Sequence, residues 1–478
     1  MLDDLNQITT LAPNAAVLLV GIAALAGTVW TAVITYQYLR ATPLQRQRMR
    51  HAWKIARRWN RQAKNLGLAR IDENTRGTTD WRGQKKQTIT VVPKLVVKPE
   101  PYGIRAQMKT IPKVGLAEVQ AAAEWIADDW DCESVEAVRI KSGLVEIRGL
   151  VGNPLDEHFP YDFDSQGWAL PIGRNPWGRE ISIPLKDLSG IKIAGMPGYG
   201  KTMLQLGFLG RLTNSPAVQF CLFDGKTSDP RYGDWGQVAG RAMFVVGDNP
   251  ETAHQRLTEL VRLIKDRPAQ LVEERGTHKF WKHGPTETIP LVPVLMDECH
   301  NYIDASGLRG KDKDLIESNQ RLMRTVAKEG RGLGVLPIVA TQKQTSDAIP
   351  TSVRDQLEVG ICFPVFTMDG AEAALGSGIR KDEANDPTAM VDKDNPGVCV
   401  VTGVPGLSGR YDRVRVGDVD ENHLLALVAN SLELRRDVIP AAAPTVRDAS
   451  AGTPTPAEET TQGIPLQKPK TTRRRKAS

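Results

Sequence analysis

One eight-residue motif, Gly195–Thr202, constrains the fold of this 478-residue chain more than any other feature, because it reads G-x-x-x-x-G-K-T, the spacing of a phosphate-binding loop. Residues 190–194 before it read G-I-K-I-A and predict a short buried strand, and residues 203–209 after it look like the first turns of a helix. Glycines let successive N–H groups turn toward a phosphate, and the helix N-terminus adds the positive end of its dipole. The motif therefore predicts a nucleotide site in an α/β domain.

The loop residues have different expected roles. Lys201 would reach the β- and γ-phosphates of ATP, and the Thr202 hydroxyl would hold Mg²⁺. The phosphate cradle as a whole is expected to comprise Gly195, Met196, Pro197, Gly198, Tyr199, Gly200, Lys201 and Thr202. The expected cofactors are therefore ATP and Mg²⁺.

Two further segments predict the rest of a hydrolytic site. An apolar run at 291–296 ends in Asp297 and Glu298, as in a strand that is buried on both faces of a parallel sheet. Asp297 would orient Mg²⁺, and Glu298 would polarise the attacking water as general base. A third buried strand at 335–340 leads to Gln342, whose amide is expected to bond both the γ-phosphate and that water.

The N-terminal region predicts a membrane anchor. Residues 15–36 carry no charge and, at about 1.5 Å per residue, would span roughly 33 Å as a helix, against about 30 Å of hydrocarbon. We therefore expect a transmembrane helix at 15–38. Acids precede it, and ten Lys or Arg with no acid follow between residues 40 and 70, so residues 1–14 are expected outside and the rest in the cytoplasm. A secretory signal peptide would need a positive region in front.

The basic segment 39–70 has helical spacing, with one apolar face. That face is expected to comprise Ala52, Ile55, Ala56, Trp59, Ala63 and Leu66. Two interpretations are open: the helix lies on the anionic inner leaflet, or it contacts nucleic acid. Its proximity to the predicted anchor favours the membrane surface. Residues 71–100 are polar and irregular, and they predict a linker.

The remaining chain divides into three predicted parts. Residues 101–165 form a small α/β module, with a strand at 103–108, a helix at 116–130 and a hairpin of 135–140 with 144–147. Residues 166–437 form the nucleotide-binding motor, ending in a helix at 421–436. Residues 438–478 are rich in Pro, Ala and Thr and predict a disordered tail, whose basic end either contacts phosphate backbone or is simply solvated.

Several blocks in the motor resemble one family. Arg331–Lys343 reads R-G-L-G-V-L-P-I-V-A-T-Q-K and is similar to the R-x-x-G-(I/V)…A-T-Q-(R/K) pattern of FtsK/SpoIIIE-type DNA translocases. The strings at 170–173 and 370–376 resemble other family blocks in the expected order. The resemblance implies a RecA-like motor that forms a hexameric ring around double-stranded DNA. It also implies an arginine supplied to the neighbouring subunit, for which Arg331 and Arg354 are the candidates.

One predicted span joined to a compact motor is most similar to the conjugative transfer proteins of actinomycete plasmids and integrative elements. The resemblance therefore implies an ATP-driven, membrane-anchored double-stranded DNA translocase that moves DNA between cells. The alternatives are a chromosome-segregation pump at division and a coupling or secretion ATPase whose substrate is single-stranded DNA or protein. The five cysteines are scattered and the seven histidines show no ligand spacing, so neither a disulfide framework nor a zinc site is expected.

Overall fold

The computed structural model describes residues 28, 32, 35–72, 89–345, 348–392 and 396–439. Within these ranges no helix is both long and apolar enough to cross a membrane. The predicted span at 15–38 lies mostly outside them, and the predicted outer segment 1–14 and tail 438–478 lie almost wholly outside. These three assignments remain predictions.

The small module is built on a four-stranded antiparallel sheet in the order β3-β4-β6-β5. Its strands are β3 (Leu95–Glu100), β4 (Gly103–Lys109), β5 (Ser134–Lys141) and β6 (Leu144–Leu150). The predicted strand at 103–108 and the predicted hairpin are confirmed. The helix predicted over 116–130 is instead two helices, α3 (Leu116–Ala121) and α4 (Ala123–Trp130). They meet at Ala122, whose φ of −96° and ψ of 6° depart from the α-helical values.

The basic segment forms helix α2 (Pro43–Asn65), which begins at a capping box between Thr42 and Gln45. Its apolar face is buried in the module core, where Ile55 and Trp59 belong to one cluster with Ile104 of β4. The Trp59 indole N–H donates to the Pro93 carbonyl at 2.7 Å. The separate juxtamembrane helix predicted at 39–70 is thus wrong in one respect: its apolar face packs on protein. Six basic residues remain exposed: Arg50, Lys54, Arg57, Arg58, Arg61 and Lys64.

The predicted linker at 71–100 is also partly wrong. Strand β1 (Arg70–Asp72) pairs antiparallel with β2 (Ile89–Val91), and β3 follows as the edge strand of the module sheet. Leu95 and Val97 pack against the module core. Such short strands carry little periodicity of their own, and β3 forms here because β4 offers it a partner edge.

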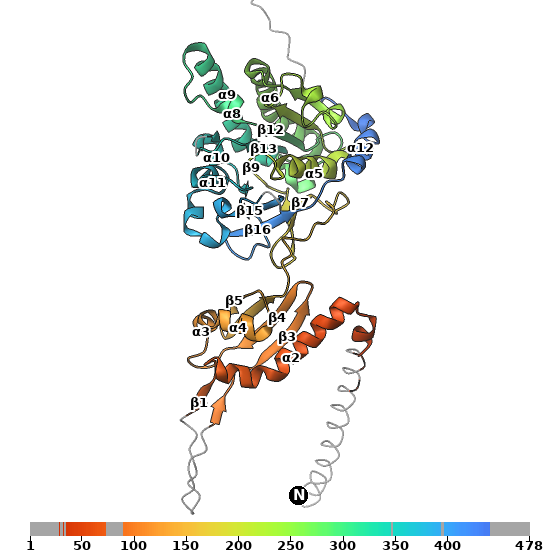
Figure 1. Ribbon diagram of the computed structural model, residues 1–478. Helices are drawn as coiled ribbons and strands as arrows, with labels where there is room; N and C mark the ends of the chain where they lie inside the picture. The colour runs from red at the N-terminus through yellow and green to blue at the C-terminus, as the bar shows by residue number, and fades with distance from the viewer. Residues whose placement is uncertain are drawn as a thin grey trace, which may run out of the picture. The chain divides into compact units, whose positions relative to one another are not determined.

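The motor contains a ten-stranded sheet (Figure 1) in the order β11-β10-β12-β13-β9-β14-β15-β16-β7-β8. The parallel part comprises β11 (Ala242–Val246), β10 (Phe220–Asp224), β12 (Val292–Asp297), β13 (Val335–Thr341), β9 (Ile191–Ala194) and β14 (Val359–Cys362). The antiparallel part comprises β15 (Val398–Thr402), β16 (Tyr411–Val416), β7 (Ala169–Arg174) and β8 (Glu180–Pro184). The predicted α/β class with a parallel sheet is confirmed for this part.

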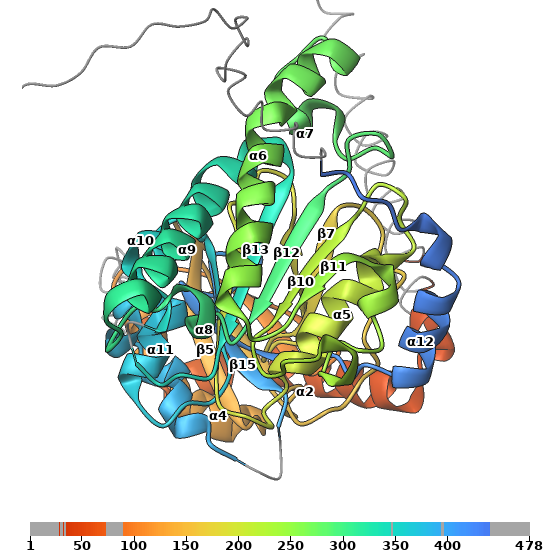
Figure 2. The same ribbon diagram turned by 90° about the horizontal axis from the view of Figure 1, so that it is seen from above.

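Helices cover both faces of the parallel strands, and Figure 2 shows α6 and α9 on one side with α5 and α12 on the other. Alternate strand side chains divide accordingly: Leu222 and Leu295 join the core beneath α5, whereas Phe223 and Met296 join the core beneath α6. The helices are α5 (Lys201–Thr213), α6 (Pro250–Arg275), α7 (Phe280–His283), α8 (His300–Ile303), α9 (Gly310–Glu329), α10 (Thr351–Arg354), α11 (Met368–Leu375) and α12 (Glu421–Ala429). The helix predicted over 421–436 therefore ends earlier, at Ala429.

The strand order brings the predicted motifs to one edge. Strand β13 lies between β9, which leads into the phosphate-binding loop, and β12, which ends at Asp297. In the parallel register Thr341 pairs with Ala194, and Asp224 pairs with Asp297. The carboxyl ends of these strands therefore share the edge at which open α/β sheets bind ligands.

Candidate nucleotide site

The phosphate-binding loop connects β9 to α5, as predicted, and its shape depends on glycine. Gly195, Gly198 and Gly200 have φ values of 147°, 82° and 107°, in the region that side chains rarely adopt. A Cβ at Gly195 would lie 2.5 Å from the Cβ of Phe363, so that position also excludes a side chain by contact. The loop therefore keeps backbone groups close to the space in front of α5.

Lys201 is the first residue of α5 and is only 4% exposed. Its ammonium donates to the carbonyls of Gly195 at 2.8 Å and Met196 at 3.1 Å. Burial lowers the pKa of Lys201 to about 8, although the carboxylates of Asp297 and Glu298 act in the opposite direction. A desolvated ammonium held inside the loop is placed to bind a phosphate that enters it.

Asp297 ends β12 and is 1% exposed. Its Oδ2 lies 2.8 Å from the ammonium of Lys226, and its Oδ1 is buried without a hydrogen-bond partner. Thr202, in the first turn of α5, lines the pocket at the phosphate-binding loop. Among the residues that the structure describes, no three His, Cys, Asp or Glu side chains are grouped to hold a metal ion. This donor set fits Mg²⁺, which takes one or two protein ligands and completes its shell with phosphate and water.

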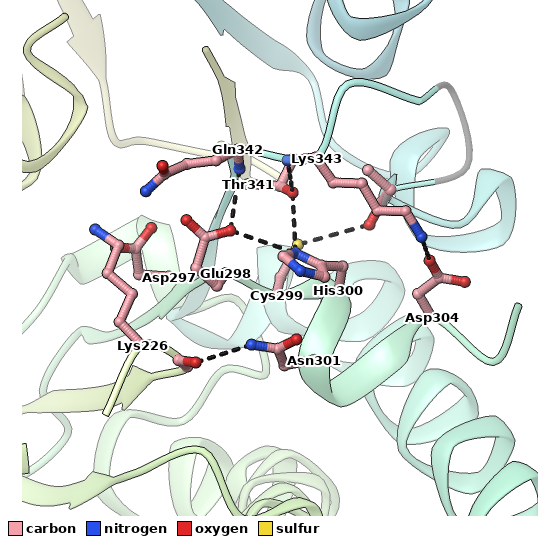
Figure 3. Close-up of polar contacts among 12 residues, drawn as sticks. Lys226, Asp297, Glu298, Cys299, His300, Asn301, Asp304, Thr341, Gln342 and Lys343 are labelled. Atoms are coloured by element: carbon pink, nitrogen blue, oxygen red, sulfur yellow. Dashed lines mark hydrogen bonds and ion pairs between the residues drawn. The ribbon is translucent and has the colours of Figure 1, made fainter. Parts of the chain in front are cut away.

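Glu298 follows Asp297 with a φ of 46° and is 6% exposed. Figure 3 shows its Oε2 accepting a hydrogen bond from the Gln342 backbone N–H at 3.1 Å, with the His300 Nδ1 at 3.3 Å. Burial raises the pKa of Glu298, and the neighbouring Asp297 carboxylate raises it further. A carboxylate held at this edge with a raised pKa suits a general base.

A pocket of about 420 Å³ lies at the phosphate-binding loop, and its lining does not include Asp297 or Glu298. It contains the predicted loop residues Pro197, Gly198, Gly200, Lys201 and Thr202, together with Gln342. It is also lined by Lys226 and by residues that the sequence motifs did not indicate: His158, Asp234, Gly397, Val416 and Asp418. Lys226 carried a partial signal, since it follows the end of strand β10. The other residues lie in segments far from the phosphate-binding loop in the sequence, and no local motif marks them.

Arg331 lies apart from this edge. It is exposed in a short 3₁₀ turn, Gly330–Leu333, which precedes β13, and its carbonyl accepts a hydrogen bond from the Trp281 indole at 3.2 Å. The site residues instead follow the carboxyl end of β13. Arg354 ends α10 and likewise precedes its strand, β14. Both arginines therefore lie before the amino ends of their strands, whereas the phosphate-binding loop follows the carboxyl end of β9. A role for either arginine in a neighbouring subunit remains a prediction.

Comparison of the sequence with known proteins finds similarity to DNA translocases FtsK, the proteins that the motifs resemble. A 261-residue stretch is 24% identical to the DNA translocase FtsK of Staphylococcus aureus (strain Mu50), covering 51% of this chain and 30% of that protein. FtsK of Helicobacter pylori (strain 26695) is 22% identical over 262 residues, covering 52% and 29%. The chain thus spans no more than 30% of the length of these curated relatives. No family model matches the chain. The predicted resemblance to FtsK-type proteins is confirmed.

Two solved structures have similar chains. The pCW3 conjugation coupling protein TcpA, a monomer form with ATPγS, aligns with 80% of this chain and 100% of its own, at 15% identity and a TM-score of 0.49. The cytoplasmic domain of the Thermomonospora curvata type VII secretion ATPase EccC aligns with 59% of this chain and 33% of its own, at 18% identity and a TM-score of 0.42. Neither TM-score reaches 0.5, so these structures do not extend what the similarity to FtsK indicates.

Proposed function

We propose that this chain hydrolyses ATP with a RecA-like motor and uses the energy to move along double-stranded DNA. The observation that carries the proposal is the convergence of three motifs at one sheet edge. Lys201 lies in the phosphate-binding loop after β9. Asp297 ends β12 and Glu298 follows it, and β12 is two strands away from β9 in the sheet. Gln342 follows β13, the strand between β9 and β12.

The roles of the residues follow from their positions. Lys201 would donate to the phosphates, and Thr202 and Asp297 would hold Mg²⁺, which supplies charge neutralisation to the transferred phosphoryl group. Glu298 would accept a proton from the attacking water. The Gln342 backbone N–H donates to Glu298, and Gln342 lines the pocket, so its side chain would bond the γ-phosphate.

Double-stranded DNA is the proposed substrate because the chain is similar to FtsK, whose name states DNA translocation. A homo-oligomer, by analogy a hexameric ring, would bring an arginine of the neighbouring subunit to the nucleotide, and Arg331 is the proposed residue. Its exposure and its position at the opposite end of β13 are compatible with reaching a neighbour.

We further propose that the chain is a single-pass membrane protein with its N-terminus outside, and that it serves conjugation rather than chromosome segregation. The uncharged segment at 15–36 and the ten basic residues after it support the anchor. The single predicted span and the compact motor favour transfer between cells.

The experiment that tests the proposed activity is ATP hydrolysis by the full chain in detergent, with duplex DNA, single-stranded DNA or none. The full chain is needed because a fragment beginning at residue 72 would remove α2 from the module core. Stimulation by duplex that disappears in Lys201→Ala is the expected result. Stimulation by single strands alone, or no stimulation, would overturn the choice of substrate.

A further inference from the structure

The ammonium of Lys226 lies where two carboxylates meet. It is 2.8 Å from Asp297 Oδ2 and 2.8 Å from Asp234 Oδ2, and Figure 3 shows it beside Asp297. Lys226 and Asp234 both line the nucleotide pocket, whereas the Asp297 side chain is almost fully buried. One ammonium is thus shared between a buried inner acid, Asp297, and a half-exposed outer acid, Asp234.

The backbone holds Lys226 at this point. The N–H of Lys226 donates to Asp224 Oδ1 at 3.1 Å, and the N–H of Gly225 donates to the Asp297 carbonyl at 3.2 Å. The Asn301 side chain donates to the Gly225 carbonyl at 2.8 Å. A Cβ at Gly225 would lie 2.9 Å from the Asp297 carbonyl oxygen, so this close approach requires glycine.

The outer acid is brought in by a second glycine. A Cβ at Gly233 would lie 2.0 Å from Asp224 Oδ2, so only glycine lets the loop before Asp234 pack onto the end of β10. Asp234 is half exposed, at 46% of its side chain. An ammonium paired with Asp234 alone would therefore remain at the mouth of the pocket.

The inner acid needs a cation. A buried carboxylate without a cationic partner is unfavourable, and Asp297 already has one oxygen without a hydrogen-bond partner. Lys226 therefore neutralises Asp297 at the place where a divalent cation would bind.

We infer that Lys226 is a positioning residue that occupies the metal-binding oxygen of Asp297 in the nucleotide-free chain and pairs with Asp234 alone when Mg²⁺ and nucleotide are bound. Lys226 then competes with the metal ion for Asp297 Oδ2, and it stands beside Asp234 when the phosphates are in place. This inference rests on the proposed function, since it concerns the same nucleotide site.

The test measures metal dependence instead of turnover. The full chain in detergent is mixed with a fixed concentration of a non-hydrolysable ATP analogue, and the melting temperature is followed as Mg²⁺ is added. In Lys226→Met, which keeps the length but removes the charge, the Mg²⁺ concentration at half-effect should fall by roughly 5-fold or more, within the ordinary range of coupling between competing ligands. Without Mg²⁺ this variant should melt below the wild type, because Asp297 loses its cation.

Two further variants make the test specific. Asp234→Asn removes the alternative acceptor, so the half-effect concentration should rise. Lys343→Met is the matched control, because Lys343 pairs with Asp304 at 2.5 Å beside the site without contacting Asp297, and its half-effect concentration should be unchanged.

The outcomes distinguish failure of the inference about Lys226 from failure of the proposed function. A half-effect concentration in Lys226→Met that equals or exceeds the wild-type value overturns the inference, as does an equal fall in Lys343→Met. Asp234→Asn decides the question independently if Lys226→Met does not fold. If the wild type shows no shift with nucleotide and Mg²⁺, the proposed function fails, and the inference fails with it.

Discussion

Glu298 and Gln342 are joined across two adjacent parallel strands by a 3.1 Å hydrogen bond from the Gln342 backbone N–H to the Glu298 carboxylate. The backbone of Glu298 has an unusual conformation, with a φ of 46°. The hydrogen bond holds the Glu298 carboxylate against the backbone of Gln342. One hydrogen bond thus joins the proposed general base to the residue that is proposed to contact the γ-phosphate.

This relationship predicts the behaviour of Glu298→Gln. The amide can still accept the Gln342 hydrogen bond, so the loop should keep its shape and nucleotide binding should be retained. Hydrolysis should fall by roughly 100-fold or more, because the group that takes the proton is lost. Turnover and the affinity for a fluorescent ATP analogue should be measured on the same preparation. Near-normal turnover would exclude Glu298 as the base.

The burial of Lys201 predicts a pH dependence of stability. The pKa of Lys201 is about 8 in the folded chain against 10.5 ordinarily, so between these values the unfolded chain binds the proton that the folded chain has lost. Stability from this group therefore rises with pH from about 8 to about 10.5. The melting temperature of the wild type relative to Lys201→Met should rise across that range without nucleotide. Lys192, whose pKa burial also lowers to about 8, is present in both proteins and cancels. A constant or falling difference would contradict the assigned burial.

The packing of α2 predicts unequal effects of two tryptophans on one helix. Trp59 is 3% exposed in the module core, so Trp59→Ala should lower the free energy of unfolding by about 3–5 kcal/mol. Trp53 is 39% exposed, so Trp53→Ala should change it by about 0.5 kcal/mol at most. Urea denaturation followed by circular dichroism gives both values. Equal effects would mean that the apolar face of α2 is not part of the core.

The proposed role of Arg331 predicts complementation between subunits. Arg331→Ala should bind nucleotide normally but hydrolyse it poorly, and Lys201→Ala should do neither. Mixed rings should regain part of the activity, because an intact Lys201 in one subunit meets an intact Arg331 in its neighbour. Mixing experiments with Arg354→Ala in place of Arg331→Ala test the other candidate. Full activity of Arg331→Ala alone would remove it from the site.

The part of the site that the sequence predicts correctly is the part carried by local spacing. The loop at Gly195–Thr202 is one contiguous segment, and Asp297 and Glu298 come at the end of an apolar run that forms the fully buried strand β12, so neighbouring residues indicate both positions. His158 and Asp418, whose side chains lie 2.9 Å apart at the same pocket, come from segments 260 residues apart, so no local pattern indicates their meeting.

The same distinction explains the errors in the fold. The helical period of α2 indicates an apolar face but not what covers it, and the structure buries Trp59 in the module core, edge-on to Trp130 of α4. The predicted linker contained β3 because an edge strand takes its hydrogen bonds from a neighbour that lies later in the chain. The break at Ala122 likewise has no glycine or proline to mark it.

The most direct test of the account is movement along DNA. A duplex carrying a short third strand is mixed with the full chain and ATP, and release of the third strand is followed over time. The account predicts release that requires hydrolysable ATP and duplex flanking the third strand, and that is absent in Lys201→Ala and Glu298→Gln. Release that proceeds equally with a non-hydrolysable analogue, or none despite duplex-stimulated hydrolysis, would contradict ATP-driven translocation.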